Sequence, residues 1–68
     1  MKKATISTKK STLIGTFVKW EDNNDFLGSL YLNNEKTGKI YSGFVRHDNV
    51  AIIYSNGTFY GRFKAVIS

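Results

Sequence analysis

Residues 50–63, VAIIYSNGTFYGRF, hold the strongest structural signal in the chain. Two runs of β-branched and aromatic residues flank Asn56-Gly57, a dipeptide typical of a two-residue hairpin turn because both residues accept the positive φ of a type I′ turn. Such a turn also sets the register, and the residues of each cross-strand pair share one face of the sheet. The expected pairs are Tyr54 with Phe59, Ile52 with Gly61, and Val50 with Phe63.

Four glycines lie in the middle of expected strands, each between two large apolar residues. The pattern apolar-x-Gly-x-apolar recurs at Gly15, Gly28, Gly43 and Gly61. A glycine inside a strand weakens it, so repeated ones indicate a tightly curled sheet in which strands bend or approach closely. We therefore expect all four glycines to face the interior.

Polar loops separate five expected strands, at residues 12–20, 26–33, 39–46, 50–55 and 58–67. No segment has apolar residues at a helical period for long enough to form a helix. Short connections favour a meander of neighbouring strands. The predicted fold is all-β: a small, strongly bent, five-stranded antiparallel sheet, formed by residues 12–68, that closes into an SH3-like or OB-like barrel.

Residues 1–11 are expected to form a basic N-terminal arm, with an edge strand as the alternative. The chain has a formal charge of +5, and its first ten residues carry four lysines and no acid. The rest of the chain is therefore close to neutral. Because a nucleic-acid-binding domain usually has a basic face on the fold itself, the high pI is weak support for that function.

The sequence lacks the residues that several functional classes require. The chain has 68 residues and no cysteine, so it is one domain without disulfides, of a size that needs very good packing or a partner subunit. We expect a cytoplasmic location, because neither a signal peptide nor a membrane span is recognisable. His47 is the only histidine, and the acids at residues 21–25 do not match a calcium loop, so we expect no metal or other cofactor. Without a nucleophile–base pair, phosphate loop or paired catalytic carboxylates, we expect no enzyme.

Strand alternation, counted from the glycines, divides the large residues between two faces. The core face is predicted to hold Leu13, Phe17, Phe26, Leu30, Leu32, Tyr41, Val45, Val50, Ile52, Tyr54, Phe59, Phe63, Ala65 and Ile67. The opposite face would hold Ile14, Val18, Trp20, Leu27, Tyr31, Ile40, Phe44, Ile53, Tyr60 and Val66. These ten apolar side chains are too many for a face in contact with water.

Three explanations for the second face stay open. A β-bulge would switch the alternation along a strand and return some residues to the core. A homodimer or partner interface would cover the face, through Ile14, Val18, Trp20, Leu27, Ile40, Phe44, Ile53 and Tyr60. A nucleic-acid site would stack bases on aromatic residues and meet phosphates with cations, through Lys9, Lys10, Trp20, Tyr31, Phe44, Arg46, Tyr60, Arg62 and Lys64.

Residues 15–20 (GTFVKW) and 44–47 (FVRH) resemble the two RNA-binding strands of cold-shock domains, in which such strands present stacking aromatics on an OB barrel. The resemblance covers about ten of the 68 residues and departs from the family pattern elsewhere. Glu21 stands where an aromatic residue is expected after Trp20, and residues 26–29 replace an aromatic-rich second strand. We therefore base no assignment on it.

Two functions follow from these observations. The first is a non-enzymatic module that binds nucleic acid through the basic arm and an aromatic and basic sheet face. The second is a small protein-interaction or inhibitor module, of the kind found in phages and mobile elements, that docks through its apolar face on another protein or on a second copy of itself. The residues Tyr60, Arg62 and Lys64, which alternate along one strand, are the best local support for the first.

Overall fold

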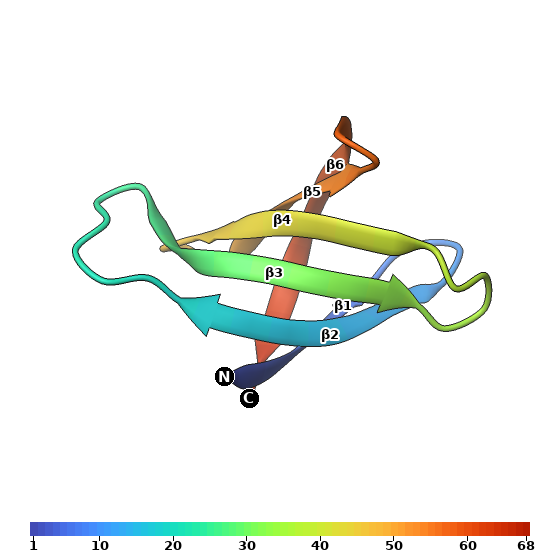
Figure 1. Cartoon of the computed structure of the whole chain (residues 1–68), viewed down its shortest axis with the longest axis horizontal. Helices are drawn as coiled ribbons and strands as arrows, with labels where there is room; N and C mark the ends of the chain where they lie inside the picture. The colour runs from blue at the N-terminus through green and yellow to red at the C-terminus, as the bar shows by residue number, and fades with distance from the viewer.

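The protein is a closed barrel of six antiparallel strands. The computed structural model describes all residues, 1–68. The strands are β1 (Lys2–Ser7), β2 (Thr12–Lys19), β3 (Phe26–Asn34), β4 (Ile40–Arg46), β5 (Val50–Ser55) and β6 (Thr58–Ile67). Each strand pairs with its neighbours in sequence and β6 returns to β1, so the barrel has up-and-down order (Figure 1). The predicted all-β barrel is confirmed, with six strands in place of five, and no helix of the structure could span a membrane.

The sixth strand comes from the segment that we expected to be an arm. β1 pairs with β2 along its whole length, and Ala4, Thr5 and Ile6 also pair with β6. Ala4 and Ile6 point inward and are fully buried. The expectation of an arm is therefore corrected: residues 2–7 form a wall of the barrel that is paired on both sides.

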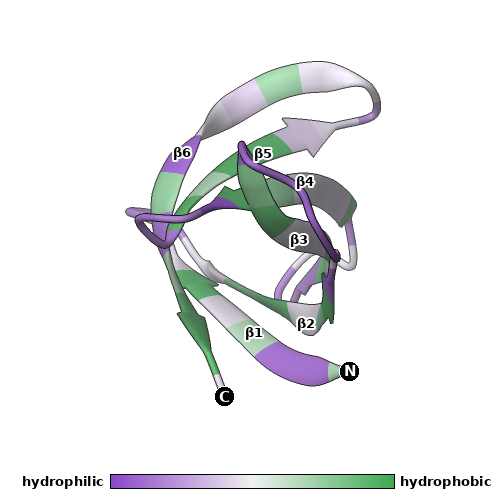
Figure 2. Ribbon diagram, turned by 90° about the vertical axis from the view of Figure 1, so that its left-hand side faces the viewer, coloured by the Kyte–Doolittle hydropathy of each residue, from purple (hydrophilic) through white to green (hydrophobic).

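Alternation along the strands fills the barrel interior with apolar side chains. Figure 2 shows hydrophobic and hydrophilic residues alternating along the strands, while the connecting loops are mostly hydrophilic. The buried core consists of Ala4, Ile6, Leu13, Phe17, Leu30, Leu32, Tyr41, Val45, Ala51, Ile53 and Ala65. Three partly buried residues pack against it: Leu27, Phe63 and Ile67.

Mid-strand glycines allow neighbouring strands to approach closely, as predicted. Gly15 pairs with the buried residues Ala4 and Leu32 on its two sides. A Cβ atom on Gly15 would collide with the carbonyl oxygen of Tyr31. No side chain fits there, so the strong curvature of the sheet depends on glycine at this position.

The β5–β6 hairpin has the predicted turn but a different register. Asn56 and Gly57 have φ of 51° and 80°, as a type I′ turn requires. Tyr54 pairs with Phe59 as expected, but the next pair joins Ile53 to Gly61, and Tyr60 is left as an extra residue. The expected pairs of Gly61 with Ile52 and of Phe63 with Val50 are therefore wrong.

This bulge, together with a second one in β3, changes the predicted faces. A one-residue shift of register moves all later residues of a strand to the opposite face. In β3 the extra residue is Leu27, since the ladder passes from the pair Phe26–Arg46 to the pair Gly28–Val45. Two residues were expected on the opposite face but belong to the interior: Ile53 is buried in the core, and Leu27 packs against it. Five residues were expected in the core but lie on the outer face: Phe26, Val50, Ile52, Tyr54 and Phe59.

Replacing Ile6 by Ala tests whether β1 closes the barrel. A buried isoleucine truncated to alanine typically costs about 2–5 kcal/mol, so we expect Ile6→Ala to lower the free energy of unfolding by that amount. Urea unfolding followed by far-ultraviolet circular dichroism measures it. The control is Ser7→Ala, the adjacent exposed position, expected to change stability by less than about 0.5 kcal/mol. Equal stability of the two variants would mean that the segment is an arm.

The close approach at Gly15 predicts a second stability effect. Gly15→Ala places a Cβ against the Tyr31 backbone, so we expect a loss of at least about 1–3 kcal/mol through overpacking. Thr16→Ala, on the exposed face of the same strand, is the matched control. Thermal unfolding of both variants measures the difference, and an unchanged midpoint for Gly15→Ala would contradict the strand spacing described above.

Candidate nucleic-acid interface

Five aromatic side chains form a continuous row on the outer face of the barrel, here called the aromatic row. The row crosses from the end of β2 to β6 and consists of Trp20, Phe26, Phe44, Tyr54 and Phe59. Successive ring centroids lie 6.2 Å (Trp20–Phe26), 5.4 Å (Phe26–Phe44), 6.3 Å (Phe44–Tyr54) and 6.1 Å (Tyr54–Phe59) apart. Four of the rings are half-buried, and Phe59 is 53% exposed. The rings therefore support one another while part of each stays open to solvent.

Strand register brings these rings together. The Trp20 amide donates to the Leu27 carbonyl over 2.8 Å and extends the β2–β3 ladder to the tryptophan. The bulge at Leu27 turns Phe26 outward, so its ring reaches both Trp20 and Phe44. The bulge at Tyr60 has the same effect in β6: Phe59 faces outward beside Tyr54, whereas Gly61 faces inward beside Ile53. Both bulges are thus needed to complete the aromatic row.

Cations border the aromatic row on two strands. The Arg62 guanidinium carbon lies 5.9 Å from the centroid of the Phe59 ring, within cation–π range. Arg46 is paired with Phe26 in the ladder, and its Nη2 lies 2.8 Å from Oδ2 of Asp48. Unlike Arg46, Arg62 has no carboxylate partner, so its charge is left free for a ligand.

The predicted binding residues fall into two groups. Trp20, Phe44, Arg46, Arg62 and Lys64 lie on the outer face, on or beside the aromatic row. Tyr31 is also on this face and 61% exposed, but its ring does not join the row. The second group, Lys9, Lys10 and Tyr60, lies at one end of the barrel. The prediction that Tyr60, Arg62 and Lys64 share one face is therefore wrong, because the bulge turns the ring of Tyr60 to the end of the barrel.

Three members of the aromatic row were missed by the sequence interpretation: Phe26, Tyr54 and Phe59. Simple alternation assigned all three to the core. The missing information was which of the mid-strand glycines mark a bulge: the extra residues, Leu27 and Tyr60, directly precede Gly28 and Gly61. Of the predicted partner interface, Ile14, Val18 and Ile40 lie on the outer face, whereas Ile53 is buried in the core.

Four lysines gather at the end of the barrel that holds the β1–β2, β3–β4 and β5–β6 turns. This region, here called the lysine mouth, contains Lys9, Lys10, Lys36 and Lys39. A pocket of about 320 Å³ opens there and is lined by Lys10, Ser11, Asn34, Lys36, Thr37, Lys39, Tyr41 and Tyr60. No carboxylate lines it, so its lining is cationic and hydroxyl-rich.

Two tyrosines form the wall of the lysine mouth. The ring of Tyr60 lies 4.9 Å from that of the buried Tyr41, centroid to centroid. Loss of hydration raises the pKa of the Tyr60 phenol, and the nearby Tyr41 phenol raises it further. Tyr60 is consequently a neutral group at physiological pH and does not repel an anion that enters the mouth.

A buried asparagine holds the turns of the lysine mouth together. The Asn34 side-chain oxygen accepts hydrogen bonds from the amides of Lys36 (2.8 Å) and Thr37 (3.2 Å). Its amide nitrogen donates to the Ser11 hydroxyl over 2.9 Å, which connects the β3–β4 turn with the β1–β2 turn. Asn34 is therefore positioned to keep the lysines of the two turns at a constant separation.

Charge is separated between the two ends of the barrel. Three acids, Glu21, Asp22 and Asp25, lie in the β2–β3 loop, and Asp48 lies in the β4–β5 turn at the same end. The remaining acid, Glu35, is next to the lysines. Four lysines thus lie at one end of the barrel and four of the five acids at the other, a separation that the overall charge does not reveal.

Neither the residues of the chain nor its comparison with known proteins identifies a reaction or a family. No group of three or more histidine, cysteine or carboxylate side chains is arranged to hold a metal ion. The imidazole Nε2 of His47 lies 3.0 Å from the Asn23 carbonyl oxygen and connects two loops. No protein-family model, curated protein or solved structure matches the chain.

Removing the Asn34 side chain tests its role at the lysine mouth. Asn34→Ala leaves the turn amides without an acceptor, so we expect a loss of about 1–3 kcal/mol in unfolding free energy and faster amide exchange at residues 36–37. Asn33→Ala, at the exposed neighbouring position, is the matched control and should change neither. Hydrogen exchange measured by NMR reports both effects. Equal exchange in the two variants would show that the turns are held together by other contacts.

Proposed function

We propose that the protein is a non-enzymatic module that binds single-stranded nucleic acid, with bases on the aromatic row and phosphates at Arg62 and the lysine mouth. The observation that carries this proposal is the aromatic row itself. Single-strand-binding proteins combine stacking aromatics with a cationic path for the backbone, and each stacked base contributes about 1–3 kcal/mol. As expected from the sequence, we place the protein in the cytoplasm.

The β5–β6 hairpin supports a connection between the two regions. Phe59 and Tyr60 are consecutive, yet Phe59 belongs to the aromatic row and Tyr60 to the lysine mouth. Figure 1 shows this hairpin projecting from the barrel. A bound strand that stacks a base on Phe59 would therefore pass its next phosphates toward Arg62 and the lysines.

The distribution of acids favours one placement of the strand. The Trp20 end of the aromatic row is next to the β2–β3 loop, which carries three carboxylates. Phosphates would be repelled there, whereas uncharged bases would not. In this binding mode, phosphates are attracted to the β6 end of the aromatic row, and bases stack along its whole length.

A protein partner is the second candidate, and one observation favours it. Ile40 is 67% exposed on β4 and Tyr31 is 61% exposed on β3, two strands that also carry members of the aromatic row. Exposed apolar side chains of this size are typical of contact surfaces when they are contiguous. A second copy of the chain, or a different protein, would bury these side chains. Because the contact is apolar, its affinity would not depend on salt concentration.

An oligonucleotide titration tests the proposed function. Quenching of Trp20, the single tryptophan, reports binding of a 12-nucleotide oligo(dT), and a fall in affinity with salt reports phosphate contacts. We expect Phe59→Ala to weaken binding by about 5- to 150-fold, which corresponds to one lost stacked base. Val66→Ala, an exposed apolar residue on the same strand, is the control and should bind like the unmodified protein.

The same samples distinguish the second candidate. Light scattering at low and high salt gives the mass of the protein with and without oligonucleotide. A stable dimer at high salt whose tryptophan does not respond to oligonucleotide would reject nucleic-acid binding and support the protein interface. Equal affinity of Phe59→Ala and Val66→Ala would show that bases do not stack on the row.

A further inference from the structure

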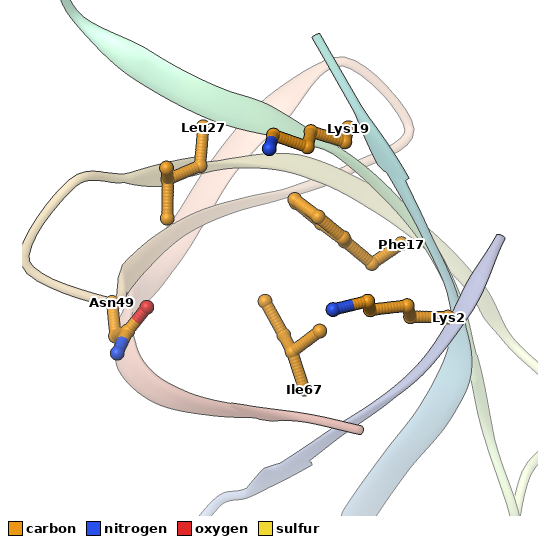
Figure 3. A pocket seen from close by; sticks show the side chains of 6 residues that line it. All are labelled: Lys2, Phe17, Lys19, Leu27, Asn49 and Ile67. Carbon is orange, nitrogen blue, oxygen red and sulfur yellow. The ribbon is translucent and has the colours of Figure 1, made fainter.

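The end of the barrel opposite the lysine mouth holds a second pocket. Its volume is about 270 Å³, and six residues line it: Lys2, Phe17, Lys19, Leu27, Asn49 and Ile67 (Figure 3). None of these residues belongs to the aromatic row or to the lysine mouth. The pocket is therefore a separate feature that the proposed function does not use.

Two lysines reach this pocket because they continue inward-facing rows of the barrel. Lys2 precedes the buried Ala4 by two residues on β1, and Lys19 follows the buried Phe17 by two residues on β2. Alternation therefore directs both side chains to the inner side of the rim. In Figure 3 both ammonium groups lie on the cavity side, and the side chain of Asn49 faces them across the opening.

Neither ammonium group has a counter-ion in the protein. The one salt bridge of the structure joins Arg46 to Asp48, and no carboxylate lines the pocket. Two like charges directed into one small space repel each other, and a bound anion removes that repulsion. The carboxyl group of Asp48, which is nearest in sequence to Asn49, is occupied by Arg46 and by the Val50 amide.

Backbone hydrogen bonds hold the asparagine at the rim. Asn49 has a φ of 65°, its amide donates to the Arg46 carbonyl over 3.0 Å, and its carbonyl accepts from the Ala65 amide over 3.0 Å. The backbone of Asn49 is thus fixed at the rim of the pocket, and its side-chain amide offers N–H donors to an oxygen ligand. Together with the two lysines it makes a rim of hydrogen-bond donors.

The floor of the pocket is apolar. The rings and methyl groups of Phe17, Leu27 and Ile67 lie beneath the donor rim, and all three belong to the core or pack against it. A fully hydrated ion such as free phosphate would leave this floor uncovered. A ligand that carries an apolar body behind its anionic group would cover it and gain about 25 cal/mol for each Å² removed from water.

We propose that this end of the barrel binds a small carboxylate with a short apolar chain, its carboxylate on Lys2, Lys19 and Asn49 and its chain on the apolar floor. The volume of the pocket, about 270 Å³, supports a small ligand. A six-carbon acid is small enough for this volume.

Titration of the full chain with hexanoate tests the site. Using ¹⁵N-labelled protein, we expect saturable NMR shifts at Lys2, Lys19, Asn49 and Ile67, and no saturation with hexanol or acetate at the same concentrations. Lys2→Gln and Lys19→Gln should each weaken hexanoate binding by about two- to five-fold, as expected for exposed charge pairs. Both side chains are exposed, so neither variant disturbs the core.

Lys3→Gln is the matched control, because Lys3 is adjacent in β1 and faces the opposite side of the strand. It removes the same charge from the chain and should leave the hexanoate affinity unchanged. Equal weakening by Lys3→Gln and Lys2→Gln, or shifts that grow without saturation at lysines over the whole surface, would overturn the site. Equal binding of hexanol would overturn the role of the two ammonium groups. These outcomes do not depend on whether the protein binds nucleic acid.

Discussion

The register shift at Tyr60 in β6 is the constraint on which the candidate interface depends. It leaves one residue of β6 without a partner in β5, so that Phe59 faces outward beside Tyr54 while Gly61 faces inward beside the buried Ile53. Gly61 makes this possible, since a Cβ there would lie 2.8 Å from the Phe63 ring that packs against the core. One extra residue therefore decides which face of the sheet β6 presents before and after Tyr60.

Closure by β1 completes the structure in a different way. A sheet of β2 to β6 alone would have two unpaired edges, and exposed edges recruit other strands. The pairing of β1 with β2 and β6 satisfies both edges and adds Ala4 and Ile6 to the interior. A chain of 68 residues without disulfides gains core residues and loses its open edges in one step.

The two ends of the closed barrel differ in chemistry because alternate connections lie at opposite ends. The lysine mouth collects turns rich in lysine, and the opposite end collects the acidic β2–β3 loop together with the inward lysines Lys2 and Lys19. Between them, the outer face carries the aromatic row. A small barrel without an enclosed cavity thereby presents three surfaces of different chemistry.

Local chemistry was readable from the sequence alone: the Asn56-Gly57 turn, the strand positions, the inward glycines and the all-β class all follow from interactions between residues close in the chain. For the candidate site, Trp20, Phe44 and Arg62 were placed correctly on the outer face. Only the tertiary structure decided that Phe26, Tyr54 and Phe59 join them, and that residues 2–7 are a wall and not an arm. The physical reason is that a bulge and a closing strand are stabilised by packing and pairing between distant segments, whose free energy no local pattern records.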